Sequence, residues 1–160
     1  MNENSNYPDD RIPNIRAVDA IRAAPGMYVG DFPTGALLVA RLVESLILLD
    51  VAPLRVARTG SWYSVYAEKD WLMMENGAVC FDAFQRLIPL PSGGRFCDRA
   101  EVILTALADA VVTSDTSGVS WISGQPDEWS LPDGIDLSLR RGRIVAFHYS
   151  KFDPADGRNT

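Results

Sequence analysis

The spacing of hydrophobic residues changes at about residue 53, and this change limits the possible folds more than any other feature. Between 36 and 50, apolar residues recur at helical spacing, which predicts an amphipathic helix ended by Pro53. The segments from 54 to 81 alternate or are apolar throughout, as strands are, and Asn76-Gly77 between two of them is typical of a hairpin. A helical pattern returns at 99–112, with Asp98 as a candidate N-cap.

The flanking segments complete the expected fold. We expect a short helix at 15–23, ended by Pro25-Gly26, and a second hairpin at 135–149 that turns at Arg141-Gly142, whereas 113–134 has no clear period. Such an order is typical of the α+β class, a two-layer structure with helices on one face of a mostly antiparallel sheet. We expect one domain at 15–150, with an irregular N-terminal arm (1–14) and a flexible C-terminal tail (151–160).

The composition argues against several classes of function. The 160 residues carry a net charge of −6, which disfavours direct nucleic-acid binding because that calls for clustered Lys and Arg. The longest apolar run, at 46–49, is far too short to cross a membrane, and the start of the chain is polar and acidic, unlike a secretory signal; a cytoplasmic protein is expected. With one histidine and two cysteines without metal-ligand spacing, we expect no metal site.

Two stretches carry a family resemblance. Ala20-Ile-Arg-Ala-Ala-Pro-Gly-Met-Tyr-Val-Gly-Asp31 resembles the Arg-x-x-Pro-Gly-Met-Tyr-Ile-Gly-Asp signature that opens the ATPase domain of gyrase B and of its topoisomerase IV counterpart. Ala100-Glu-Val-Ile-Leu-Thr-Ala-Leu107 resembles the Ala-Glu-Val-Ile-x-Thr-x-Leu helix of the same family. The family belongs to the GHKL ATPase superfamily. The resemblance covers about 15–149 and implies a two-layer α/β sandwich of GHKL (histidine kinase/gyrase B-like, Bergerat) type.

The catalytic helix of that family carries Glu-x-x-x-Asn, in which Glu is the general base and Asn holds magnesium. The resemblance places Glu44 at the position of the base, in the helix at 36–50. Four residues on is Leu48, which cannot bind a hard cation, and no Asn occurs between Asn14 and Asn76. Glu44 is therefore a remnant of the general base, or a surface residue that pairs with Arg41, and the magnesium ligand is missing.

The nucleotide-binding motifs of the family are also altered. Its Asp-Asp-Gly-Arg-Gly-Ile-Pro motif, reached after a hairpin strand, corresponds to 82–89, where Gln85 and Leu87 replace the glycines and the adenine-reading position falls on Ala83, one residue after Asp82. Its glycine-rich lid corresponds to 114–124, where a single Gly-Val remains and Asp115 adds a negative charge. The remnants of a nucleotide site are Asp82, Arg86, Ile88, Pro89 and Gly118.

Two further groups of residues have open interpretations. The arginines at 140, 141 and 143 are typical of a solvated turn, although they suit a phosphate contact as well. The four tryptophans, at 62, 71, 121 and 129, are expected in the core or in a patch that binds a partner.

Two functions fit these observations. The first is a catalytically inactive, gyrase B-like GHKL domain that acts as a protein-binding or regulatory module, without a cofactor. Its partner would be a protein such as a topoisomerase or another GHKL protein. The alternative is a diverged nucleotide-binding domain that retains weak ATP binding with little or no hydrolysis. The combined loss of the Asn, the motif glycines and the lid favours the first.

Overall fold

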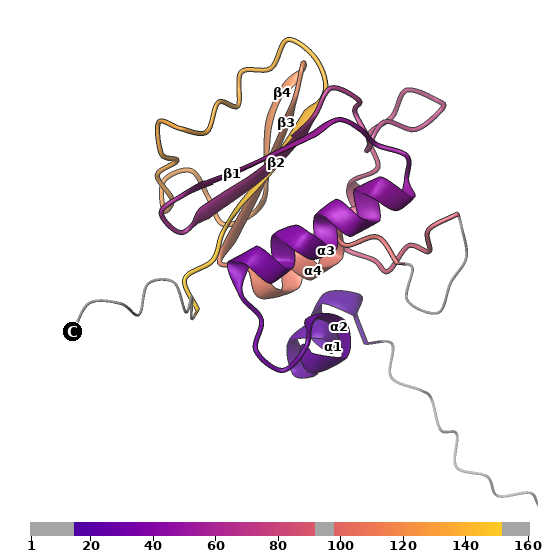
Figure 1. Ribbon diagram of the computed structural model, residues 1–160, viewed down its shortest axis with the longest axis vertical. Helices are drawn as coiled ribbons and strands as arrows, with labels where there is room; N and C mark the ends of the chain where they lie inside the picture. Colours follow the sequence, from indigo (N-terminus) through magenta and orange to yellow (C-terminus); the bar gives the residue numbers. More distant parts are fainter. Residues whose placement is uncertain (1–14, 92–97, 152–160) are drawn as a thin grey trace, which may run out of the picture.

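The computed structural model describes residues 15–91 and 98–151, and it has helices and a five-stranded antiparallel sheet (Figure 1). The α+β class is confirmed. The expected arm at 1–14 and all but the first residue of the expected tail at 151–160 lie outside the described residues. In chain order the elements are α1 (Ala17–Ala23), α2 (Gly26–Val29), α3 (Gly35–Leu48), β1 (Leu54–Thr59), β2 (Trp62–Ala67), the 3₁₀ helix η1 (Phe81–Phe84), α4 (Glu101–Leu107), β3 (Ala110–Asp115), β4 (Gly118–Ser123) and β5 (Arg143–His148).

The sheet joins two hairpins through a strand that comes later in the chain. Its order is β1-β2-β5-β3-β4, and all four neighbouring pairs are antiparallel. β1–β2 and β3–β4 are the hairpins, and β5 lies between them. Phe147 of β5 pairs with Tyr63 of β2 on one side and with Val111 of β3 on the other. β1 and β4 are consequently the two edge strands.

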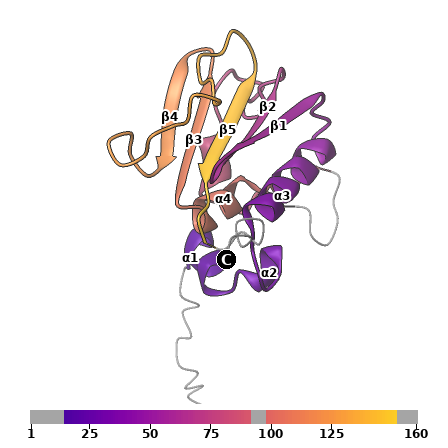
Figure 2. The ribbon, with the colours of Figure 1, turned by 60° about the vertical axis from the view of Figure 1, so that its left-hand side comes forward.

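Helices α3 and α4 lie on one face of this sheet, as the sequence predicted (Figure 2). Leu38, Leu42 and Leu46 of α3 are fully buried, and the stacked rings of Tyr63 and Phe147 face them from the sheet, with ring centroids 5.4 Å apart. The helix approaches the sheet closely at its first residue, Gly35. A Cβ there would overlap the ring of Tyr63, so only glycine fits while that ring keeps its position.

The opposite face of the sheet is covered by the loop 124–142 rather than by a helix. A second hydrophobic cluster forms here around Trp62, whose ring meets those of Trp121 and Trp129 edge to face at centroid distances of 6.4 Å each. Trp71 is buried in the cluster on the helical face. All four tryptophans thus take part in packing, which was the first of the two expectations for them.

The hairpin expected at 71–81 forms only in part: the Met74 N–H bonds to the Ala78 carbonyl and the Cys80 N–H to the Leu72 carbonyl, at 2.8 Å each, but neither side is a strand. Only an isolated bridge between Met73 and Val79 forms, although Asn76-Gly77 does make a turn, with Gly77 at φ +79°. Side chains take the backbone donors that a ladder would need: Asp70 accepts from the Leu72 N–H at 3.1 Å, and Asn76 accepts from the Ala78 N–H at 3.0 Å. Local turns therefore replace the strands.

The boundaries expected in the last third are also corrected. α4 begins at Glu101 without a side-chain cap and ends at Leu107, while Asp98 forms a bridge with Pro89 instead of capping the helix. Residues 110–112, expected to be helical, begin β3, where β-branched side chains favour a strand. The first half of the hairpin expected at 135–149 is not a strand; only β5 forms.

Candidate functional site

α3 places Glu44 on the surface. Its carboxylate oxygen accepts a hydrogen bond from Nη1 of Arg41 at 2.6 Å, and the Glu44 side chain is 58% exposed. Leu48, where the resemblance would place the magnesium ligand, is 42% exposed at the end of the same helix. The structure thus contains the pairing with Arg41 that was the alternative to a catalytic role.

Asp82 lies on η1 with its side chain exposed, whereas the next residue, Ala83, is fully buried. The strand expected before this motif is absent, apart from the bridge at Val79. The Asp82 carbonyl accepts from the Arg86 N–H at 2.9 Å, which keeps 82–86 as one tight turn. An adenine-reading carboxylate at position 83 would point into the core, and the one at 82 points to solvent.

The other remnants follow η1 or lie on the edge of the sheet. Arg86 is exposed and lines a hollow with Arg16 and Ala17 beside α1, Ile88 is half-buried, and Pro89 bridges to Asp98. Gly118 begins β4, with φ +139°. Asp82 and Arg86–Pro89 therefore belong to one segment, while Glu44 and Gly118 stand on separate elements.

The segment expected to correspond to the lid is the β3–β4 hairpin, which is in register from its turn to the pair Val112–Trp121 and has a register shift beyond it. Asp115 of β3 pairs with Gly118 of β4, and its carboxylate accepts hydrogen bonds from the N–H groups of Ser117 (2.8 Å) and Gly118 (3.3 Å). Burial raises the pKa of Asp115, but the bonds from Ser117 and the charge of Arg143 outweigh this, so the pKa lies below its ordinary value. The turn is thus closed around an ionised carboxylate.

A buried arginine, expected from the sequence in a solvated turn, links three strand ends. Arg143 is 1% exposed and makes two bonds to Asp70 (2.5 and 2.9 Å), one to Asp115 (2.7 Å) and one to the hydroxyl of Thr113 (3.0 Å). The expectation was wrong for Arg143, although Arg140 and Arg141 are exposed. No spacing in the sequence distinguishes the three, because the difference arises from where β5 enters the sheet.

His148 does not form a catalytic triad. Its Nδ1 lies 3.0 Å from Oδ2 of Asp109, and the same oxygen accepts from the backbone N–H and the hydroxyl of Ser150. The serine hydroxyl thus contacts the acid, whereas a nucleophile would have to contact the imidazole. The imidazole packs on Trp62 and Trp129 at centroid distances of 5.4 and 4.6 Å. This cluster joins the end of β5 to the start of β3.

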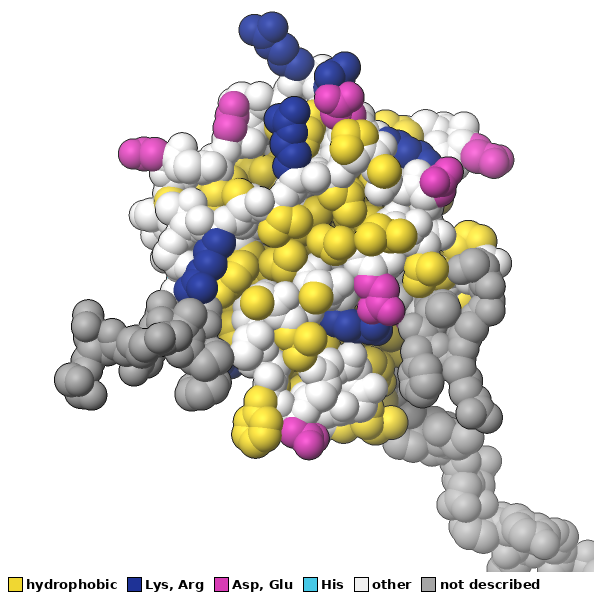
Figure 3. Space-filling model, in the orientation of Figure 1, with side chains coloured by type: hydrophobic (Ala, Val, Ile, Leu, Met, Phe, Trp, Pro, Cys, Tyr) yellow, Lys and Arg dark blue, Asp and Glu magenta, His cyan; other side chains and the backbone are white. Residues whose placement is uncertain are grey.

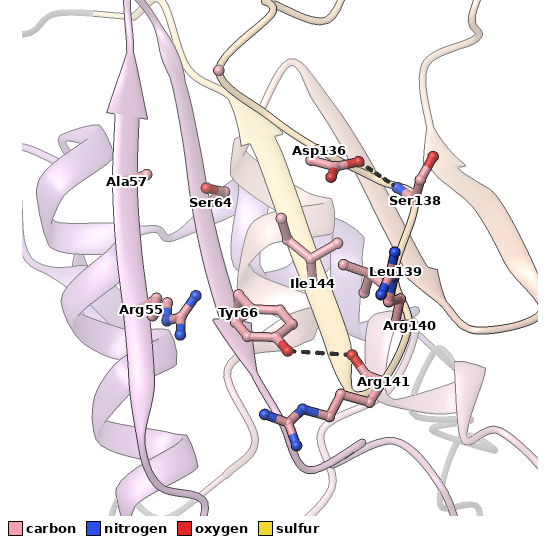
Figure 4. A pocket seen from close by; sticks show the side chains of 11 residues that line it. Arg55, Ala57, Ser64, Tyr66, Asp136, Ser138, Leu139, Arg140, Arg141 and Ile144 are labelled. Carbon is pink, nitrogen blue, oxygen red and sulfur yellow. Dashed lines mark hydrogen bonds between the residues drawn. The ribbon is translucent and has the colours of Figure 1, made fainter.

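A pocket on the loop-covered face gathers three arginines; we call it the arginine pocket (Figure 4). Its volume is about 380 Å³, and its walls come from β1, β2, β5 and the loop. Arg55 lies over the ring of Tyr66, 5.6 Å from the centroid, and the Tyr66 hydroxyl donates to the Arg141 carbonyl at 3.3 Å. The lining residues are Arg55, Ala57, Ser64, Tyr66, Gly134, Asp136, Ser138, Leu139, Arg140, Arg141 and Ile144.

Most of the positive charge in this pocket is accessible. Arg141 pairs with Glu68 at 2.6 Å, but among residues 15–91 and 98–151 neither Arg55 nor Arg140 has an ion pair with an acidic side chain. The one acid in the lining, Asp136, accepts from the Ser138 N–H at 2.8 Å. The sequence indicated Arg140 and Arg141 as a cluster but gave no sign that Arg55 joins them.

A second hollow lies on the helical side of β1; we call it the hydrophobic groove. It has a volume of about 290 Å³ and is lined by Ala36, Val39, Val56, Ala57, Arg58 and Tyr63. Figure 3 shows hydrophobic side chains gathered across the middle of this face, over α3 and β1. Val56 is 53% exposed, and Ile47, further along α3, is 63% exposed. The open edge of β1 lies between the two hollows.

In the described parts of the chain, no helix has the length and apolar character needed to cross a membrane, and no group of three or more His, Cys, Asp or Glu residues is placed to hold a metal ion. No protein-family model matches this sequence, and no curated protein matches it either. The case for its function therefore rests on the residues and their geometry.

Proposed function

We propose that this chain is a gyrase B-like GHKL domain that lacks ATPase activity and serves as a protein-binding or regulatory module. The two family-like motifs support the assignment, because both have a structural role here. In the first, Gly30 has φ +85°, a conformation that favours glycine, and a Cβ on Gly26 would crowd the Asp31 carboxylate. In the second, the fully buried Glu101 binds Arg99 (2.7 Å) and the Trp71 ring N–H (3.1 Å). The parts that resemble the family are those that stabilise the fold.

The β3–β4 hairpin is the observation that carries the inactive assignment. A phosphate cradle needs several backbone N–H groups that point at one anion. In 114–119 the pairing of Ser114 with Val119 and of Asp115 with Gly118 forms the sheet ladder instead. The negative charge of Asp115 opposes a triphosphate, and Leu48 supplies no oxygen for magnesium.

Exposed apolar side chains support the binding role. Large hydrophobic residues on α3, on β1 and in the segment up to η1 are between 42% and 63% exposed: Ile47, Leu48, Val56, Met73, Met74 and Phe81. Figure 3 shows hydrophobic side chains gathered over α3 and β1, and apolar surface of that kind is typical of a contact with another protein. A topoisomerase or another GHKL protein is the proposed class of partner.

Measurements of phosphate release test the proposed lack of ATPase activity, and measurements of partner binding test the proposed binding role. We expect no magnesium-dependent release of phosphate from ATP by the purified protein, and no difference between the wild type and Glu44→Ala. Release that disappears in Glu44→Ala would overturn the inactive assignment. Partner binding is measured with immobilised GHKL ATPase domains: Ile47→Asp should reduce it, and Met27→Asp, a substitution on α2 at a residue 78% exposed, should not. Equal binding by both variants would contradict the proposed surface.

A further inference from the structure

β1 is an open edge with different chemistry on its two sides. It pairs with β2 alone, no strand of the described residues lies on its other side, and five of its six residues are exposed. Natural proteins commonly protect such an edge with a covering loop, a proline, a bulge or charged side chains, and of these β1 carries charges, at Arg55 and Arg58. Here β1 contains no proline and pairs with β2 in a regular register throughout. The edge is suited to accept another strand.

The geometry of the β1–β2 hairpin determines which N–H and C=O groups of β1 are free to bond at the open edge. Thr59 pairs with Trp62 across a two-residue turn, and in such a hairpin every second residue exchanges its backbone bonds with the partner strand. The residues between direct their N–H and C=O groups outward. By this alternation Arg55 and Ala57 bond to β2, and Val56 presents its N–H and C=O at the open edge.

Side chains of β1 also alternate between the two faces. Val56 lies opposite Val65 and lines the hydrophobic groove, whereas Arg55 lies opposite Tyr66 and lines the arginine pocket. A strand added along β1 continues the sheet, so its own side chains alternate in the same way. One set would meet the groove, and the other would meet the arginines.

The charge of the arginine pocket indicates which side chains of the added strand would face it. Arg55, Arg140 and Arg141 gather at this pocket in a chain whose net charge is −6. Carboxylates on the added strand would neutralise them, and guanidinium groups suit carboxylates because their donors form a fork. A nucleic acid fits less well, because it offers neither backbone bonds to Val56 nor apolar groups for the groove, and the acidic remainder of the surface repels it.

We propose that β1 binds an extended acidic segment of a partner protein as an added strand. Alternate residues of that segment are apolar and fill the hydrophobic groove, while the residues between are Asp or Glu and face Arg55 and Arg140. This inference rests on the proposed protein-binding function and specifies the kind of segment that the partner presents.

The test uses short fluorescent peptides and the full chain, with binding followed by fluorescence anisotropy. A peptide of alternating Val and Glu should bind, and two controls should bind about tenfold more weakly: alternating Val and Lys, and a peptide with the Val and Glu composition arranged in two blocks. Equal binding of the Lys peptide would overturn the role of the arginines. Equal binding of the block peptide would overturn the added strand.

Variants locate the site. Arg55→Glu should weaken binding of the Val-Glu peptide about tenfold, and Arg16→Glu, at an exposed position just before α1, should leave it unchanged.

Val56→Pro removes the outward N–H and should abolish binding, whereas Val56→Ala keeps the N–H and should lower the affinity less. Equal binding by Val56→Pro and Val56→Ala would contradict backbone pairing. Circular dichroism checks that each variant folds. If Val56→Pro does not fold, Arg55→Glu and the two control peptides still test whether an acidic strand binds along β1.

Failure of this inference is distinguishable from failure of the proposed function. If Ile47→Asp loses a protein partner while no Val-Glu peptide binds, the domain is a binding module that uses another surface. If the peptide binds as described and magnesium-dependent ATP hydrolysis is also found, the strand site stands and the inactive assignment does not.

Discussion

Arg143, the first residue of β5, and Asp70, in the segment that follows β2, form a two-bond ion pair, with the arginine 1% and the aspartate 14% exposed. Asp115 binds the same guanidinium from β3, so the charge joins strands from both hairpins. Removal of the cation from such a site leaves two carboxylates partly buried and close together. The pair therefore bears on the stability of the whole sheet.

We expect Arg143→Met to lower the free energy of unfolding by about 3–5 kcal/mol, because it leaves Asp70 and Asp115 without a cation. Arg140→Met, an exposed arginine of the same cluster, should change it by less than about 0.5 kcal/mol. Urea unfolding followed by circular dichroism measures both. Adding Asp70→Asn and Asp115→Asn to Arg143→Met should restore part of the loss; no recovery would mean that packing rather than charge accounts for it.

Acid should destabilise the protein through Asp115. Its pKa in the folded chain lies below the ordinary value of 3.8, so the unfolded chain binds the proton more tightly. The stabilisation is complete above pH 3.8 and is lost as pH falls through the folded pKa. Unfolding experiments across this range should show a smaller pH dependence in Asp115→Asn than in the wild type. The same slope in both proteins would exclude a contribution from this carboxylate.

Contact between Gly35 and Tyr63 should make Gly35→Ala costly. The added methyl group overlaps the Tyr63 ring, and overpacking of this kind costs about 1–3 kcal/mol. In a Tyr63→Leu background the same substitution should cost less, because the overlapping atoms are gone. Thermal or urea unfolding of the four proteins gives the coupling. Additive effects would show that contact with the Tyr63 ring is not the source of the cost.

We expect no saturable rise in melting temperature with ATP or a non-hydrolysable analogue. A ligand that binds only the folded state raises that temperature by mass action, and the proposed inactive domain has Asp82 exposed on η1 and residues 114–119 paired as a hairpin. A saturable shift that Asp82→Ala abolishes would favour the alternative function, a domain that retains weak ATP binding, and would place the adenine at Asp82.

The sequence predicted the elements whose ends are marked by turn residues or by a proline. The helix expected at 36–50 is α3 at Gly35–Leu48, because its apolar residues fall on one side, and the strands around Thr59-Gly60 form β1 and β2. β3 was missed because its first residues, Ala110 to Val112, continue the apolar run of the helix expected at 99–112, and because a strand buried on both faces does not alternate in polarity. Leu137 and Leu139 do alternate, but they cover the sheet from a loop without joining a ladder.

The sites were less predictable than the fold. Glu44 and Asp82 were found through the family resemblance, and the pairing of Glu44 with Arg41 was one of two predictions for it, but the exposed place of Asp82 on η1 was not predicted. The arginine pocket depends on contact between β1 and the loop at 134–141, which are far apart in the chain. Periodicity reports which side of an element is buried, but not which distant element lies there.

The central place of β5 also orders the events by which the chain folds. Each hairpin can form from contacts near in sequence, yet Trp62 and Ala110 both pair with His148, across long intervening segments. Closing loops of that length costs conformational entropy before the strand pairs form, so we expect this step to limit the folding rate. A nascent chain that has not yet released residues 143–148 from the ribosome would hold two unconnected hairpins. Its apolar faces would meanwhile be available to chaperones.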